Sequence, residues 1–473
     1  MQELGGNRGN FLLNVNLVFL SQIAIYGAAF GLRIILARGL GDEGLGTYSL
    51  FFLAVIVVGG IVNLGVGLGN IFFLNKGTYS YRALLAGTLF VLAVTTALTW
   101  VLVAAIGLIA EPDLFVSGRA FWLYAAALPA VVAYVLLTSF LHGSSRFVAL
   151  TTVAVSQGLS GLLMVGGLYA ADVLDVFSAL AAWAGSFLLA DLLALAFVGV
   201  RNVDLRGILR PQWHVLKEQV RYGAQGQIAN LAQLFNYRLD QFLVAAFVSR
   251  AAVGHYTVAV GLGESVWWIS SAVAMVLLPR LTQMDSDRAR ELTPLVSRNI
   301  VLISIGAAAV LMAVSPILIR VLFGGAFTPA TWPLIFLMPG VIAASATRVL
   351  GSYLFSRGRV IYNTYATFIA LGVTLALDMV LIPTLEVAGA AIASSIAYVA
   401  SLAATLYWYS KVSGGSVWQA LIFRPSDRRF YGDLLQRLRT RAFSVRKKAT
   451  EAPANGTVAD RDSTTHHTDD IDR

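Results

Sequence analysis

The sequence predicts an all-α polytopic membrane protein with about twelve transmembrane helices. Of its 473 residues, 58% are hydrophobic and only 12% are charged, about half the charged fraction of a soluble globular domain. Apolar stretches of about 20 or more residues recur along the chain, and each is long enough to cross a bilayer core. The lysines and arginines gather in alternate loops, as expected when one set of loops is cytoplasmic.

The predicted spans follow one another with short connections. Their approximate limits, from windows of about 19 residues, are 11–36, 47–74, 83–110, 120–142, 147–170, 176–200, 222–248, 255–279, 295–323, 331–355, 361–383 and 388–409. No small-residue cleavage pattern follows the first stretch, so it is interpreted as a retained helix and not as a signal peptide.

The basic residues give the predicted topology. One set of loops has about four times as many lysines and arginines as the other, which contains only Arg38, Arg119, Arg250 and Arg320. This asymmetry predicts that both termini are cytoplasmic and that the number of spans is even. The formal net charge of +9 then belongs to these loops, and a nucleic-acid partner is not expected.

The composition also limits the chemistry. The chain has no cysteine and five histidines, which excludes disulfides and thiolate metal sites and leaves little for a metal cluster. His466 and His467 are adjacent, but they lie in a polar tail and are interpreted as solvated residues. We find no paired catalytic carboxylates, nucleophile elbow or phosphate-binding glycine loop. We therefore predict no cofactor, no metal and no enzymatic activity.

A weak internal repeat predicts two lobes. Leu-Gly-Thr-Tyr-Ser at 45–49 enters the second span as Val-Gly-His-Tyr-Thr at 253–257 enters the eighth. Because each repeat has about six spans, an even number, the two repeats have the same orientation in the membrane. The predicted parts are an N-terminal six-helix lobe (1–200), a cytoplasmic linker (201–221), a C-terminal six-helix lobe (222–411), a basic amphipathic segment (412–448) and a disordered tail (449–473).

Several ionisable residues fall within predicted spans, where each costs about 2.5–3.5 kcal/mol on insertion scales. They are Arg33, Asp191, Arg238, Asp240, Glu264, Arg348 and Asp378. For Arg33 and Asp378, snorkelling to the interface is an alternative. For the deeper residues we expect either a wet cavity or a structural ion pair.

The seventh span is the most polar. On a helical plot its apolar residues form one arc, and amides and charges occupy the rest of the circumference, including Gln227, Asn230, Gln233, Arg238 and Asp240. The first span shows a weaker version with Gln22, Tyr26 and Arg33. We therefore expect the first helix of each lobe to line a polar cavity. The alternative is that the amides only join helices through narrow contacts.

Two segments, RIILARGLGDEGLGTY at 33–48 and VGHYTVAVGLGESVWWISSAVAMVLLP at 253–279, resemble a known family. They are similar to the Wzx-type polysaccharide and oligosaccharide flippases, whose superfamily includes MATE exporters and lipid II flippases. The resemblance covers about residues 10–409. It implies two six-helix lobes around a central cavity that opens alternately to each side of the cytoplasmic membrane. The implied activity is translocation of an undecaprenyl-diphosphate-linked oligosaccharide for cell-surface polysaccharide biosynthesis, often driven by an ion gradient. The implied partners are this substrate, membrane lipids and other polysaccharide-assembly membrane proteins.

Candidate roles follow from side-chain chemistry. Arginine suits a diphosphate because its fork of donors matches phosphate oxygens, so Arg33, Arg238 and Arg348 are candidate phosphate ligands. Amides and rings suit a sugar, and the candidates are Gln22, Tyr26, Gln227, Asn230 and Gln233. The candidate ion-coupling carboxylates are Asp240, Glu264, Asp191 and Asp378, because gradient-driven carriers use membrane acids as relays.

Two other functions remain open. A MATE-like cation-coupled multidrug exporter would share the fold but should have a net acidic cavity, whereas here the arginines roughly balance the acids. A membrane-embedded polysaccharide polymerase or ligase would need a catalytic constellation on sizeable external loops, and the predicted outer loops are short.

Overall fold

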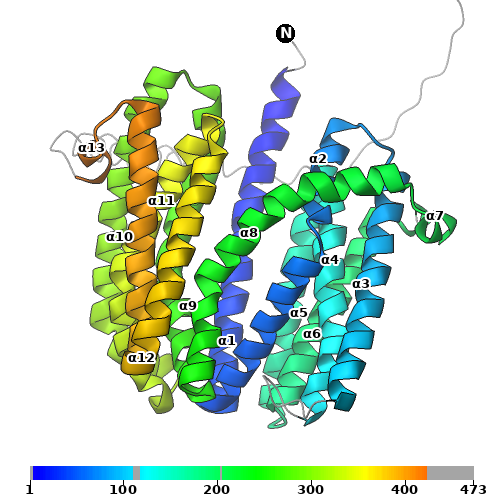
Figure 1. Ribbon diagram of the computed structural model, residues 1–473, viewed down its shortest axis with the longest axis horizontal. Helices are drawn as coiled ribbons and strands as arrows, with labels where there is room; N and C mark the ends of the chain where they lie inside the picture. The colour runs from blue at the N-terminus through cyan, green and yellow to red at the C-terminus, as the bar shows by residue number, and fades with distance from the viewer. Residues whose placement is uncertain (1–3, 110–117, 203–204, 423–473) are drawn as a thin grey trace, which may run out of the picture. The chain divides into compact units, whose positions relative to one another are not determined.

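The computed structural model describes residues 4–109, 118–202 and 205–422, and no strand occurs in these ranges. The first group of helices, here called the N-lobe, comprises α1 (Leu4–Val62), α2 (Val66–Lys76), α3 (Tyr81–Ile109), α4 (Tyr124–Gly143), α5 (Phe147–Ala170) and α6 (Val176–Val198). The second group, the C-lobe, comprises α8 (Trp213–Phe247), α9 (Arg250–Gln283), α10 (Ser286–Leu322), α11 (Thr331–Ser356) and α12 (Val360–Ser413) (Figure 1). Short elements join them: η1 (Gly118–Leu123), η2 (Val200–Asn202), α7 (Leu205–Leu209), η3 (Gly325–Ala330) and α13 (Trp418–Leu421).

Two of the helical elements are hairpins. Within α1 the backbone reverses at Gly41, with φ 72° and ψ −172°, a left-handed φ that glycine adopts without steric cost. Within α12 it reverses at Glu386, with φ 51° and ψ −130°. Among the described residues, nine elements are long and apolar enough to cross a membrane. Counting both arms of α1 and α12 and adding the more polar α8 gives the twelve spans that the sequence predicts.

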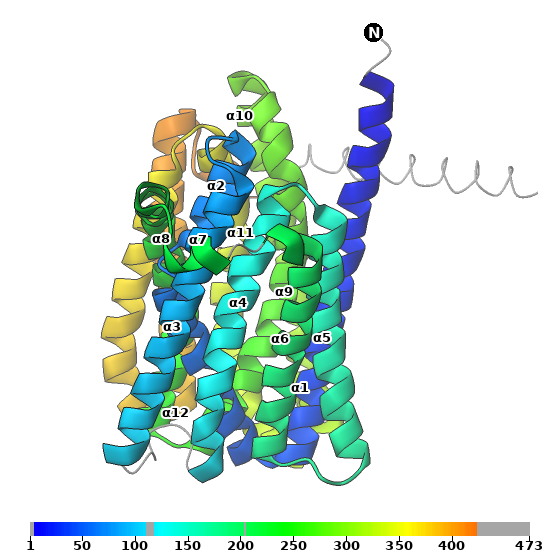
Figure 2. The ribbon, with the colours of Figure 1, turned by 90° about the vertical axis from the view of Figure 1, so that its right-hand side faces the viewer.

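The helices alternate in direction between two ends of the bundle. The first arm of α1 begins at the upper end in Figure 1 and packs beside α5, as Figure 2 also shows. Arg38 precedes the reversal of α1, Arg119 lies in η1, Arg250 begins α9 and Arg320 lies in the last turn of α10. All four therefore lie at the lower end. That the opposite end is cytoplasmic remains a prediction.

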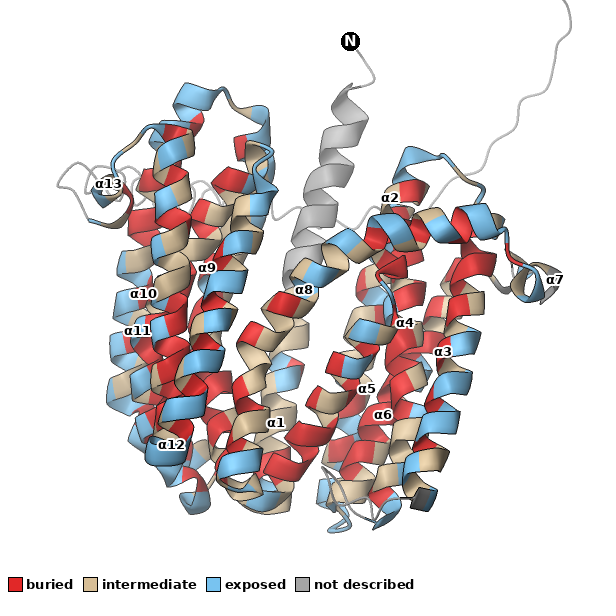
Figure 3. Cartoon of the chain, viewed as in Figure 1, coloured by how far each residue is buried: buried red, intermediate tan, exposed pale blue. Residues whose placement is uncertain are grey.

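The distribution of burial is that of a protein in lipid. Buried residues concentrate where helices face one another, and exposed residues lie on the outward faces (Figure 3). Many of these outward residues are large and apolar, such as Leu98, Trp100 and Leu192, which are 56%, 59% and 66% exposed. Faces of this kind match a hydrocarbon solvent, in which helices satisfy their own backbone hydrogen bonds.

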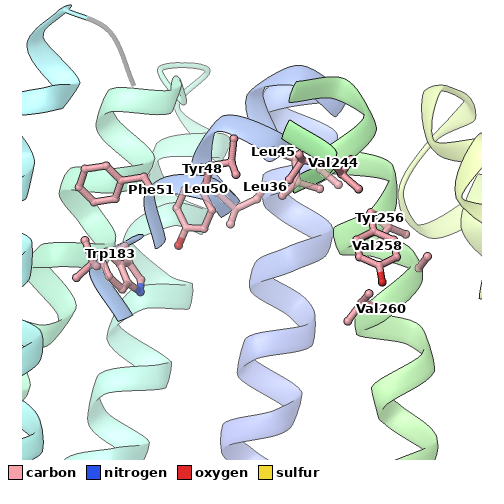
Figure 4. Close-up of a cluster of buried hydrophobic side chains, with 14 of the residues drawn as sticks. Leu36, Leu45, Tyr48, Leu50, Phe51, Trp183, Val244, Tyr256, Val258 and Val260 are labelled. Carbon is pink, nitrogen blue, oxygen red and sulfur yellow. The ribbon is translucent and has the colours of Figure 1, made fainter. Parts of the chain in front are cut away.

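One aromatic and aliphatic cluster continues from lobe to lobe. In the N-lobe, the Phe51 ring stacks on Tyr124 at 4.0 Å and meets Trp183 edge-on at 6.3 Å. The same cluster includes Leu45 of α1, Val244 of α8 and Tyr256 of α9 (Figure 4). The second arm of α1 therefore packs against the C-lobe as well as against its own lobe.

The backbones of the two lobes approach each other closely at the lower end. A Cβ at Gly46 would overlap the carbonyl oxygen of Arg250, and a Cβ at Gly254 would overlap that of Asp42. Next to this contact, Asp42 Oδ2 lies 3.2 Å from His255 Nε2. Only glycine at positions 46 and 254 allows the two backbones to approach this closely.

Helix α8 starts earlier than expected and contacts both lobes. It begins at Trp213, within the segment 201–221 predicted as a linker. Its first turns bury Val215, Leu216 and Gln219, and the Gln219 amide donates to Asn70 Oδ1 at 2.6 Å and to the Leu84 carbonyl at 3.2 Å. The start of α8 is therefore fixed to the N-lobe, a tertiary contact that hydropathy does not reveal.

Part of the predicted C-terminal organisation lies outside the described residues. The C-lobe helix α12 ends at Ser413 and α13 follows. Residues 423–448 of the predicted basic segment and the predicted tail 449–473, with His466 and His467, are not among the residues described.

Candidate functional site

A cluster of charges lies between the lobes. Arg238 Nη2 of α8 is 2.9 Å from Glu264 Oε1 of α9, and these side chains are 24% and 20% exposed. Arg33 of α1 interacts electrostatically with both Glu264 and Arg238, and its guanidinium occupies the space that a Cβ of Gly261 would need. This interlobe cluster therefore brings Arg33 and Arg238, from opposite lobes, near the carboxylate of Glu264, which is ion-paired with Arg238. Asp240 also interacts electrostatically with Arg238.

A small cavity adjoins the interlobe cluster. Its volume is about 160 Å³, and its lining includes Arg33, Arg238, Gln241, Tyr48 and Trp183. The side chains come from α1, α6, α8 and α9. Both arginines therefore face a space to which both lobes contribute.

The first-span candidates lie about two and three turns before Arg33. The Tyr26 ring stacks on Trp268 of α9, with centroids 4.8 Å apart and planes 8° apart. Gln22, four residues earlier on α1, is partly exposed. Aromatic faces and amides of this kind are the groups that the sequence predicts for sugar recognition.

Arg348 is in a different place. It lines a C-lobe cavity of about 620 Å³. Its guanidinium carbon lies 4.7 Å from the centroid of Trp267, and Nη2 donates to Tyr237 Oη at 3.4 Å. None of the carboxylates in the described part of the chain forms an ion pair with Arg348, and its Nε is buried with no hydrogen-bond partner there.

The sugar candidates on α8 are divided between two sites. Gln227 and Asn230 line two pockets of about 170 and 190 Å³ on the N-lobe side, both of which also include Asn63. The Gln227 amide donates to the Gly60 carbonyl at 2.7 Å. Gln233 instead lines the C-lobe cavity and accepts a hydrogen bond from Thr367 at 2.9 Å. The bond from Gln227 is a helix-joining contact, as the alternative interpretation of the amides expects.

Of the four candidate acids, two are brought together. Asp240 is 2% exposed and accepts hydrogen bonds from Tyr256 Oη at 2.5 Å, Ser394 Oγ at 3.0 Å and its neighbour Gln241 N at 2.8 Å. Asp378 is fully buried on α12 and interacts electrostatically with Asp240. Neither carboxylate oxygen of Asp378 has a partner among the described residues.

The other two acids lie elsewhere. Glu264 belongs to the interlobe cluster. Asp191 is 9% exposed in α6, near Tyr134, and one of its oxygens has no partner among the described residues. Snorkelling does not occur for either residue that was considered for it, because Asp378 is fully buried and Arg33 packs on Gly261.

The aromatic residues that shape these sites are not among the candidates predicted from the sequence. Trp267, Tyr237 and Tyr398 form a triad with ring centroids 5.2–5.9 Å apart, and the Trp267 Nε1 donates to the Val341 carbonyl at 3.2 Å. A signal was present: Trp267 and Trp268 follow Glu264 by three and four residues, a spacing that places side chains on one helix face. A helical plot of the eighth span would have found them.

Comparisons with known proteins agree with this architecture. The family of polysaccharide biosynthesis proteins matches residues 35–331. A probable low-salt glycan biosynthesis flippase of Haloferax volcanii, Agl15, is 23% identical over 215 residues. That match spans 45% of this chain and 45% of the relative, so this chain matches about half the length of its curated relative.

The fold is shared with solved membrane transporters. The lipid II flippase MurJ in an inward closed conformation has a TM-score of 0.65 at 14% identity, covering 84% of this chain and 87% of MurJ. An inward-facing multidrug resistance MATE family transporter has a TM-score of 0.64 at 15% identity, covering 82% and 94%. This chain therefore has the two-lobed, twelve-helix membrane fold of these transporters. Because the family match covers more than half of its residues, this multi-pass membrane protein belongs to the family of polysaccharide biosynthesis proteins.

Proposed function

We propose that the protein translocates a lipid-linked oligosaccharide, carried on undecaprenyl diphosphate, across the cytoplasmic membrane by alternating access. The observation that carries this proposal is the interlobe cluster, in which arginines from opposite lobes lie together and only Arg238 is ion-paired with Glu264. Among the described residues Arg33 forms no ion pair, so its guanidinium is available to an anion, and guanidinium forks match phosphate oxygens. Family membership and the likeness to a named glycan biosynthesis flippase support the same substrate class.

In this proposal the substrate's parts bind in different places. The diphosphate binds Arg33 and Arg238, and its oxygens replace the Glu264 carboxylate as the partner of these guanidiniums. Sugar units contact the Tyr26–Trp268 stack and the pockets of Gln227 and Asn230, where amides and ring faces are available. The carrier chain stays in the lipid, because transfer of its apolar surface into a polar cavity is unfavourable.

Alternating access requires the lobes to separate at the lower end. There the backbones around Gly46 and Gly254 touch, and Arg38 donates to the carbonyls of Leu322 and Val321. In the proposed cycle, substrate enters from the upper, cytoplasmic end and leaves when this contact opens. Asp240 and Asp378, as two buried and electrostatically coupled acids, are the proposed site at which a coupling proton or cation acts.

The proposed topology has a direct test. A phosphatase reporter fused after Tyr409, which lies in the last turns of α12, should be inactive because this end is cytoplasmic. High phosphatase activity from that fusion would reverse the orientation of the whole bundle.

The proposed activity is tested in proteoliposomes that contain a fluorescent undecaprenyl-diphosphate-linked oligosaccharide. The variant Arg33→Gln should lose most of the flipping activity while it still accumulates in the membrane, because Glu264 keeps its ion pair with Arg238. Arg119→Gln is the matched control, because Arg119 lies at the lower end over the Phe177 ring, outside the interlobe cavity. Normal flipping by Arg33→Gln would refute the diphosphate role of the cluster, and no flipping by the wild type would refute the function.

A MATE-like exporter of organic cations is the second candidate, and the buried pair Asp240 and Asp378 favours it. The two functions make opposite predictions for the interlobe cluster. Removal of the cluster's positive charge by Arg33→Gln should impair a flippase, but it should leave unchanged or improve the export of a cationic dye.

A further inference from the structure

The C-lobe cavity is chemically distinct from the interlobe cluster. Tyr237 stands between them, since it interacts electrostatically with Arg348 on one side and with Glu264 and Arg238 on the other. The cavity has one arginine and no acid among its lining residues. We propose that this cavity binds a saccharide unit that carries a carboxylate, and that Arg348 is the residue that recognises it. The inference rests on the proposed function, since the unit belongs to the translocated glycan.

The position of Arg348 is fixed before any ligand binds. Its guanidinium lies over the face of Trp267, and the Trp267 indole is itself held by the Val341 carbonyl. Only one of the five guanidinium donors has a hydrogen-bond acceptor among the described residues, at Tyr237 Oη. A preorganised guanidinium with unused donors is suited to the two oxygens of a carboxylate.

The charge of the site selects a single anion. Within the described part of the chain, no carboxylate pairs with Arg348, so one carboxylate ligand neutralises the cavity. A diphosphate has two phosphate groups, and the single guanidinium fork of Arg348 engages one of them. The interlobe cluster has two arginines and can offer a fork to each phosphate. The two anionic groups of one substrate thus have separate ligands.

The rest of the lining matches a sugar. Amides and hydroxyls from α8, α11 and α12 surround the cavity, and the rings of Tyr237 and Tyr398 form part of its wall; the polar residues are Gln233, Asn236, Thr347, Ser352, Asn363, Thr367, Ser401 and Thr405. These groups donate and accept hydrogen bonds, as sugar hydroxyls require, and the rings stack on apolar sugar faces. The volume of about 620 Å³ lies within the range of about 300–1,000 Å³ typical of small-molecule sites.

The absence of native cysteine allows a direct test. In Ser401→Cys the only thiol lines the C-lobe cavity, and its rate of maleimide labelling is measured in the purified full-length protein. Sodium glucuronate, glucose and inorganic diphosphate are titrated as protectants. Glucuronate should protect at a concentration at least about tenfold lower than glucose, because its carboxylate forms a charge-assisted hydrogen-bonded pair with Arg348 and glucose has no such group. Diphosphate should protect less well than glucuronate.

Two further variants complete the design. Arg348→Gln in the Ser401→Cys background should abolish the preference for glucuronate, and Arg348→Lys should restore part of it because lysine keeps the charge but lacks the fork. Asn63→Cys, in the N-lobe pockets, is the matched control and should show no such preference. Equal protection by glucose and glucuronate, no protection by either, or stronger protection by diphosphate would each overturn the proposal.

Failure of this inference is distinguishable from failure of the proposed function. If the protein flips acidic and neutral lipid-linked oligosaccharides equally well and Arg348→Gln changes neither, the function stands and the acidic-sugar pocket is refuted. If no lipid-linked oligosaccharide is flipped but glucuronate still protects the thiol of the Ser401→Cys variant through Arg348, the pocket stands and the flippase function is refuted.

Discussion

The interlobe cluster and the C-lobe cavity both place arginine inside the membrane, but they differ in how its charge is balanced. In the cluster, Glu264 forms an ion pair with Arg238 and interacts electrostatically with Arg33. In the cavity, Arg348 has an aromatic face and a tyrosine hydroxyl but no acid among the described residues. The comparison teaches that the partner of an arginine inside the membrane decides how much of its charge is left for a ligand.

The largest expected effect comes from removing the shared acid. Glu264→Gln removes the ion-pair partner of Arg238 and an acid that interacts with Arg33. We expect a cost of about 3 kcal/mol of unfolding free energy, the lower end for a broken buried pair because its side chains are partly exposed. Arg348→Gln should change stability by less than about 1 kcal/mol, because it leaves no carboxylate unpaired. The thermal unfolding midpoints of the two purified variants test this difference. Equal midpoints would remove the distinction between the two sites.

Buried carboxylates differ in the same way, because some accept several hydrogen bonds and others have an oxygen without a partner among the described residues. Asp240→Leu leaves the hydroxyls of Tyr256 and Ser394 without their acceptor, and we expect a loss of about 2–3 kcal/mol. Asp191→Leu removes an oxygen that has no partner among the described residues, so its effect should be close to neutral or stabilising. Urea or thermal unfolding of both variants gives the comparison. A larger loss for Asp191→Leu would mean that Asp191 has an undetected partner.

A glycine-to-alanine substitution at the interlobe contact should cost more free energy than the same substitution at an open surface of one lobe. Gly254→Ala adds a methyl group against the Asp42 carbonyl, and we expect a cost of about 1–3 kcal/mol to this contact. The lower end should open more often, so a thiol in Thr257→Cys, beside the interlobe cavity, should label faster. Gly306→Ala in α10 is the control, because a Cβ there meets nothing within 4 Å. Unchanged labelling in Gly254→Ala would show that this contact does not limit opening.

The smallest effect concerns a charge outside both sites. Asp175 caps α6 by accepting a hydrogen bond from Ser178 N at 2.7 Å, and Ser178 Oγ accepts one from Asp175 N. The hydrogen bond that its carboxylate accepts from Ser178 N is the main cause of the lowered pKa of Asp175. Asp175→Ala should cost about 1 kcal/mol at neutral pH.

The pH dependence of this cap has a defined sign. A lowered folded-state pKa means that the ionised cap stabilises above the unfolded value of about 3.9, and that its contribution is lost as the pH falls through the folded-state pKa. The difference in midpoint between wild type and Asp175→Ala should therefore shrink on acidification. A difference that grows at low pH would contradict the assignment of the cap.

The sequence by itself determined the class of the protein, the number of spans and the alternation of basic loops, because hydropathy and charge are local properties of each segment. It also identified α8 as polar, since an arc of amides is visible on one helix. The reversals at Gly41 and Glu386 fall between predicted spans, as a change of direction requires.

Only the tertiary structure decided which polar residues meet. From the sequence, Arg33, Arg238 and Arg348 form one set of candidates, but the packing of their helices brings the first two near Glu264 and places Trp267 under the third. Gln227 and Gln233 lie on one helix, yet α8 packs against different lobes along its length and turns them to different pockets. Whether a buried charge is neutralised depends on residues far away in the chain, and periodicity within one helix contains no information about them.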